Sequence, residues 1–71
     1  MELEYNHLVN GSYENHIISG KFNSEFDKII FSFESTNNLT ISDAKNNAMS
    51  ILLNLSNEIS KALEKIQNLK V

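Results

Sequence analysis

Residues 40–69 carry the stretch that decides the fold, TISDAKNNAMSILLNLSNEISKALEKIQNL. Apolar residues recur in it at alternating steps of four and three, which is the spacing of one face of an α-helix. No glycine or proline interrupts the run, so the pattern predicts one helix over residues 41–69. The asparagines in this stretch are poor helix formers, and a break near residues 54–57 is the main alternative.

The start of this helix is marked by Thr40 and Asp43. Threonine is a preferred N-cap residue, and its hydroxyl can accept a hydrogen bond from the backbone N–H three residues on. Asp43 stands where a capping box carries Glu or Gln, and its shorter side chain can bond back to the Thr40 amide. The helix is therefore expected to begin at residue 41.

The apolar stripe of this helix is the candidate oligomer interface. It keeps the a/d spacing of a coiled coil for about three heptads. A helix of this length spans about 42 Å, whereas strands of seven or eight residues span only about 25 Å. We therefore expect its far end to bury against a second copy, with a dimer favoured; a twisted sheet that covers the stripe and a helix that folds back are the alternatives. The predicted interface residues are Leu52, Leu55, Ile59, Ala62, Leu63, Ile66 and Leu69.

The dipeptide Asn10-Gly11 predicts a β-hairpin between strands at residues 3–9 and 12–19. Asn-Gly readily adopts positive φ at both central positions of a type I′ turn, whose twist matches two antiparallel strands. A two-residue loop at these positions sets the register of the two strands. The predicted pairs are Val9–Ser12, His7–Glu14, Tyr5–His16 and Leu3–Ile18.

Residues 28–34 form a third predicted strand. Alternation places Ile29, Phe31 and Phe33 on one of its faces, and Phe22 and Phe26 bracket a second turn around residues 23–25. These elements predict an α+β fold with an aromatic-rich sheet face for the helix to cover.

The predicted organisation is one small α+β domain spanning residues 1–71. It consists of a three-stranded antiparallel meander in residues 1–35 and one long C-terminal helix in residues 40–70. A chain of 71 residues is too short for a second domain. It also buries a smaller share of its surface than a larger domain, so it commonly needs a partner for stability.

The composition excludes several classes of function. There is no cysteine, which rules out disulfides and thiolate metal sites. All six cations are lysines and the net charge is −3, so the basic face and the arginines used in direct nucleic-acid readout are missing. No apolar run approaches the roughly 20 residues of a membrane span, and the first residues lack the pattern of a signal peptide. We expect a cytoplasmic protein that contacts neither nucleic acid nor membrane.

One group of side chains has the composition of a metal site. In the predicted register, His7, Glu14 and His16 project from one face of the hairpin, and two imidazoles with one carboxylate can bind zinc. A Glu–His surface pair is the commoner arrangement of such residues. We therefore predict no metal, no cofactor and no catalytic residue.

The N-terminal half offers a candidate surface for a basic partner. Residues 1–35 hold six acidic side chains and two lysines, a net charge of −4, although scattered charges of this kind commonly form only a solvated face. Two tyrosines, expected on opposite faces, offer large contact area at small entropic cost. The predicted partner surface comprises Glu2, Glu4, Tyr5, Tyr13 and Glu14.

These features favour a non-enzymatic interaction or regulatory module that self-associates through its C-terminal helix. The alternative is a small inhibitor, of the kind that phages and mobile elements encode, whose acidic sheet surface binds a basic host protein. The third hypothesis is a metal-dependent hydrolase built on His7, Glu14 and His16.

Overall fold

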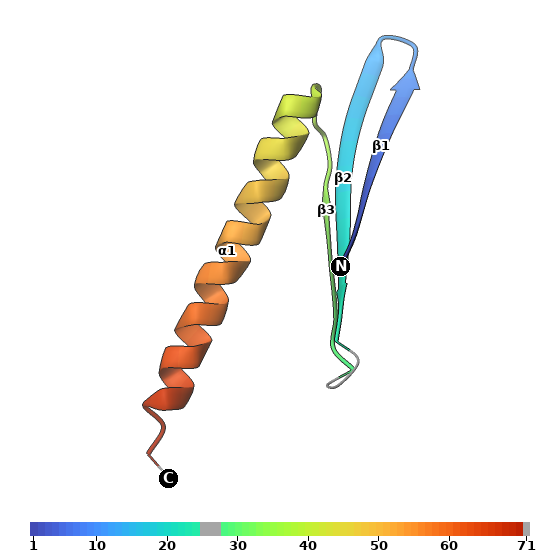
Figure 1. The fold of residues 1–71 in the computed structure, drawn as a ribbon. Coiled ribbons are helices and arrows are strands. Elements are labelled where there is room, and N and C mark those ends of the chain that lie inside the picture. Colours follow the sequence, from blue (N-terminus) through green and yellow to red (C-terminus); the bar gives the residue numbers. More distant parts are fainter. Residues whose placement is uncertain (25–27, 71) are drawn as a thin grey trace.

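The computed structural model describes residues 1–24 and 28–70. Its three strands, β1 (Glu2–Asn10), β2 (Tyr13–Asn23) and β3 (Ile30–Ser35), form one antiparallel sheet in the order β1-β2-β3. The helix α1 (Ile41–Gln67) follows and lies on one side of the sheet (Figure 1). The predicted α+β fold, a meander followed by one long C-terminal helix, is confirmed.

Helix α1 begins at the predicted residue and ends at Gln67, two residues before the predicted end. The Thr40 hydroxyl accepts a hydrogen bond from the Asp43 N–H at 3.1 Å, which is the first of the two bonds of the predicted capping box. The helix passes through Asn54 and Asn57 without a break. Each asparagine costs less than about 0.7 kcal/mol relative to alanine, whereas a break would require a second helix to nucleate.

The predicted hairpin register is wrong, although the hairpin is present. The loop is Gly11-Ser12, and Asn10 pairs with Tyr13 instead of occupying the turn. Gly11 has a φ of 64°, and Ser12 lies outside the positive-φ region. Glycine at the first central position alone is the pattern of a type II′ turn rather than the predicted type I′ turn. The observed pairs include Val9–Glu14, His7–His16, Tyr5–Ile18 and Leu3–Gly20.

The third strand lies slightly later than predicted. It begins at Ile30, so Ile29 lies outside it, and it extends to Ser35. Residue 25 of the predicted second turn, and Phe26, lie outside the described residues. Among the described residues on either side of it, the Ser24 N–H donates a hydrogen bond to the Ile29 carbonyl oxygen at 3.0 Å.

The core forms where the Phe33 ring packs over Gly20. The two residues are paired across β2 and β3, and a Cβ atom on Gly20 would clash with Phe33 Cε1 and lie 2.9 Å from Cζ. Gly20 lies inside β2, where the aromatic ring of Phe33 occupies the space of its missing side chain. On the helix side, Ala44 and Ala48 are buried, and their small side chains allow α1 to approach the sheet closely.

Helix α1 leans away from the sheet beyond these two alanines (Figure 1). Ile51, Leu52 and Leu55 are half-buried, and the apolar side chains between Ile59 and Leu69 are exposed. Strand length does not explain this exposure, because β2 has 11 residues and spans about 36 Å. The apolar face is uncovered because the helix diverges from the sheet, and not because the strands are too short.

The resulting molecule is elongated. Its principal extents are 59 × 23 × 13 Å and its radius of gyration is 16.2 Å. A compact domain of this length has a radius of gyration of about 11 Å. No helix within the described residues is both long enough and apolar enough to cross a bilayer.

We predict that Gly20→Ala destabilises the protein. In an open strand position this change would be neutral or stabilising by up to about 1 kcal/mol, but here the new methyl group meets the Phe33 ring. Overpacking of this kind costs roughly 1–3 kcal/mol. Urea unfolding at fixed protein concentration measures the change, with Ser19→Ala on the other face of β2 as the control. An unfolding midpoint for Gly20→Ala at or above that of the unmodified protein contradicts this account of the core.

Candidate functional site

A buried polar residue, Asn38, joins the sheet to the helix. Its side chain is 1% exposed, and its Nδ2 donates hydrogen bonds to the His16 carbonyl oxygen at 2.8 Å and to the Ser35 carbonyl oxygen and Oγ, both at 3.0 Å. Its Oδ1 accepts from Asn47 Nδ2 on α1. The opposite orientation of this amide would set its oxygen against two carbonyl oxygens, so the chemistry of the neighbours determines the orientation.

The backbone of Asn38 continues the sheet beyond the end of β3. Its carbonyl oxygen accepts from the His16 N–H at 2.8 Å, and its N–H donates to Asn15 Oδ1 at 3.0 Å. The preceding residue, Asn37, has a φ of 63°, a conformation that asparagine tolerates better than most residues. This left-handed residue lies directly before Asn38 in the connection between β3 and α1.

The structure brings His7, Glu14 and His16 together on the face of the sheet that also carries Phe33. Glu14 Oε2 lies 3.7 Å from Nε2 of His7 and 3.7 Å from Nε2 of His16. One ligand atom from each of the three residues lies within 4.8 Å of the others. The side chain of His16 is 11% exposed, whereas those of His7 and Glu14 are 39% and 50% exposed. The group is therefore closed on one side and open to solvent on the other.

His16 is held by more contacts than the other two residues. Its Nδ1 lies 2.7 Å from the Tyr5 hydroxyl oxygen, and its backbone N–H and carbonyl are both bonded to Asn38. The His7 ring stacks on the His16 ring at a centroid distance of 4.0 Å. The buried imidazole is thus oriented from its backbone, from one ring nitrogen and from one ring face.

The error in register does not separate this group. Relative to the predicted pairing, β2 is displaced by two residues along β1, so that His7 faces His16 instead of Glu14. Side chains alternate between the faces of a strand with a period of two. A displacement of two residues leaves every side chain on its predicted face, and the three residues remain neighbours.

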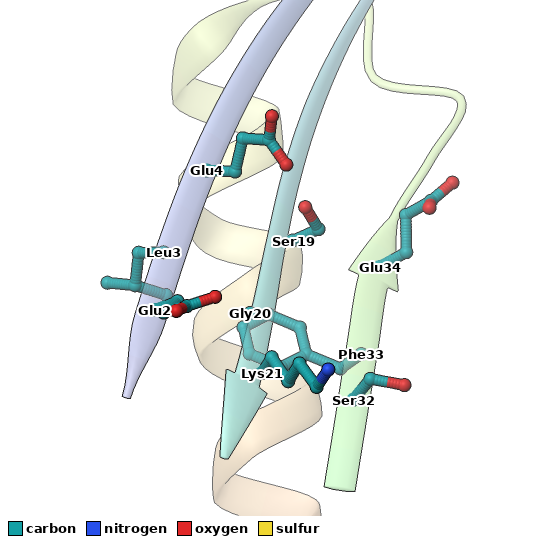
Figure 2. A pocket seen from close by; sticks show the side chains of 9 residues that line it. All are labelled: Glu2, Leu3, Glu4, Ser19, Gly20, Lys21, Ser32, Phe33 and Glu34. Carbon is teal, nitrogen blue, oxygen red and sulfur yellow. The ribbon is translucent and has the colours of Figure 1, made fainter. Parts of the chain in front are cut away.

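A groove of about 720 Å³ crosses the middle of the sheet (Figure 2). Two rows of paired residues on the face away from α1 contribute to its lining: Glu2–Lys21–Ser32 and Glu4–Ser19–Glu34. The row between them, Leu3–Gly20–Phe33, completes the lining. The groove therefore carries three carboxylates and one lysine, a net charge of −2.

The predicted partner surface is divided between the two faces of the sheet. Glu2, Glu4 and Tyr13 lie on the outer face, whereas Tyr5 and Glu14 lie on the face of the histidines. The separation of the two tyrosines is the one that the sequence predicts. Of the predicted residues, only Glu2 and Glu4 line the acidic groove, together with Glu34 of β3, whereas Tyr13 lies beside the hairpin loop.

The predicted oligomer interface is largely exposed. Leu52 and Leu55 are half-buried near the sheet, and the remaining predicted residues lie on the free part of α1: Ile59, Ala62, Leu63, Ile66 and Leu69. A mainly apolar hollow of about 230 Å³ lies at the opposite end of the sheet from the hairpin loop. Its lining residues are Met1, Phe22, Asn23, Ser24, Ile29 and Phe31.

The sequence did not reveal the role of Asn38. The chain has 11 asparagines, and nothing in the pattern of neighbouring residues separates this one from those on exposed positions. The only local signal is its place between a possible left-handed asparagine and the N-cap Thr40, which indicates a loop and not a buried contact.

The chain matches no family model, no curated protein and no solved structure.

We predict that Asn38→Ala destabilises the protein by roughly 3 kcal/mol. The change leaves the carbonyl oxygens of His16 and Ser35 buried without this donor, and each unsatisfied group costs about 1–3 kcal/mol. Asn38→Asp is expected to cost more, because a carboxylate would face the same oxygens. Urea unfolding tests both variants, with Asn57→Ala on the exposed face of α1 as the control. Equal unfolding midpoints for Asn38→Ala and the control would show that the buried amide does not hold the helix to the sheet.

Proposed function

We propose that the protein is a non-enzymatic interaction module that self-associates through α1, with a second copy of the chain as the occupant of the exposed stripe. The observation that carries this proposal is the exposure of Ile59 and Ile66, which are 52% and 64% accessible although they continue the stripe that packs on the sheet. Burying such a side chain contributes roughly 1.5–3 kcal/mol. For a small domain this is a large part of the net stability.

The total accessible surface supports an obligate partner. The chain exposes 6036 Å², whereas a compact monomer of 8.1 kDa exposes about 4,500 Å². The excess of about 1,500 Å² per chain is above the roughly 800 Å² per partner of a standard interface and in the range of obligate dimers. A second copy is the simplest occupant, because it brings an apolar stripe of matching length.

The charges beside the stripe are compatible with such a pairing. Glu58 and Lys61 form an ion pair at 3.3 Å, and Glu64 and Lys65 follow one turn later. Because both signs alternate along the rim, two identical helices can meet without a block of like charge. The rim is equally compatible with parallel and antiparallel pairing.

The sheet end of the molecule offers a second apolar surface to the partner. The hollow that includes Phe22 and Phe31 lies at the end of the sheet where α1 has moved away. Their rings are in contact, with centroids 5.8 Å apart, and both are only half-buried. A helix from a second copy that covers the stripe of α1 can cover these rings as well.

The alternative function, inhibition of a basic protein, is supported by the acidic groove of the outer face. Glu2, Glu4 and Glu34 surround one lysine there. Such a partner would bind with a strong dependence on salt. The two functions use different faces, so a dimer formed through α1 would leave the groove accessible.

We predict that Ile59→Asp converts the dimer to monomer. A dimer has a mass of twice 8.1 kDa, about 16 kDa, and an unpaired carboxylate in its interface should raise the dissociation constant by about 100-fold or more. Sedimentation equilibrium at micromolar concentration measures this. Asn57→Asp adds the same charge to the opposite face of α1 and should leave the dimer intact. The concentration of the chain should be about 50 µM, which is above the dissociation constant of a typical specific dimer. A wild-type chain that is folded and monomeric at that concentration contradicts the proposal.

A further inference from the structure

We propose that His7, Glu14 and His16 form a binding site for a divalent transition-metal ion of the zinc class, independent of self-association. All three residues come from the β1–β2 hairpin of one chain. Two imidazoles and one carboxylate are a known ligand set of zinc sites that keep an open fourth position. The proposal reverses the expectation from sequence, and the geometry of the group is the reason.

The two imidazole–carboxylate distances fit a shared cation better than a shared proton. A charge-assisted hydrogen bond between an imidazole and a carboxylate has a length of about 2.7–2.9 Å. Here both Nε2 atoms lie 3.7 Å from the same carboxylate oxygen, which is too long for a hydrogen bond. Two ligand atoms on a tetrahedral zinc ion are separated by about 3.4 Å, given metal–ligand bonds of about 2.1 Å.

Tyr5 supplies the outer contact that metal-binding histidines usually have. A ligating histidine typically uses its other ring nitrogen as a donor to a neighbouring acceptor, which selects the tautomer and orients the ring. His16 Nδ1 lies 2.7 Å from the Tyr5 hydroxyl oxygen. A proton on Nδ1, donated to this oxygen, leaves the lone pair of Nε2 free for a metal on the side of Glu14. Tyr5 is therefore a positioning residue for the site.

The backbone around His16 makes the site rigid on one side. Both backbone polar groups of His16 are bonded to the buried Asn38, so this ligand cannot move without breaking the junction of sheet and helix. His7 is the adaptable ligand, because its side chain is 39% exposed. Its ring must tilt out of the stack on His16, where the planes are only 13° apart, for the two lone pairs to converge on one ion.

The experiment is a titration of the full chain with Zn²⁺ by calorimetry. We expect one ion per chain with a dissociation constant at or below about 1 µM. A 100-fold excess of Zn²⁺ over that constant should raise the melting temperature by more than about 10 °C. Since all ligands belong to one chain, the stoichiometry should be the same for the monomeric Ile59→Asp variant if that variant is folded.

Three variants and one control identify the site. Glu14→Gln and His7→Ala, both at exposed positions, should weaken Zn²⁺ binding by more than about 100-fold, and Tyr5→Phe should weaken it by about tenfold while the metal-free melting temperature is unchanged. Glu4→Gln removes a carboxylate from the other face of the same hairpin and should leave binding unaltered. Absence of binding below about 100 µM overturns the proposal. So does binding that Glu14→Gln and His7→Ala leave intact, because the ion would then lie elsewhere.

Discussion

The attachment of α1 to the sheet depends on one buried amide. Asn38 bonds to the backbone of β2 through His16, to the end of β3 through Ser35, and to the helix through Asn47. The buried apolar residues Phe33, Ala44 and Ala48 provide contact area, but apolar contacts do not require one particular orientation. A buried, hydrogen-bonded amide does require one orientation, because any other orientation leaves its polar atoms unsatisfied at a cost in free energy. The polar junction therefore sets the angle from which the helix departs.

That angle has opposite consequences at the two ends of the helix. Near the junction, small alanine side chains allow close packing, and the helix stripe is buried. Further along, leucine and isoleucine side chains continue the same stripe where the sheet no longer reaches it. A 71-residue chain has little stability to lose, so an uncovered stripe of this length is explained more readily by a partner than by chance exposure. The proposed self-association follows from this uneven coverage.

The junction also holds one member of the histidine group, His16. Because both backbone polar groups of His16 bond to Asn38, the residue that anchors the helix is the same one that presents an imidazole to Glu14. Side chains held in this way lose little entropy on binding a ligand. The histidine group and the exposed helix stripe are separate features, so metal binding and self-association are independent proposals.

The sequence by itself determined the order and type of the elements, because hydrophobic periodicity, the Thr40 cap and a glycine-containing loop are local signals. It also placed His7, Glu14 and His16 on one face, since strand alternation survives a displacement of two residues. The register, the lean of the helix and the role of Asn38 were decided only by tertiary structure. Gly20 pairs with Leu3 on one neighbouring strand and with Phe33 on the other, and the side chains of both lie over the space of its missing Cβ. No local preference at Asn10-Gly11 encodes those contacts. A buried amide likewise becomes distinguishable from an exposed one only when its acceptors arrive from distant parts of the chain.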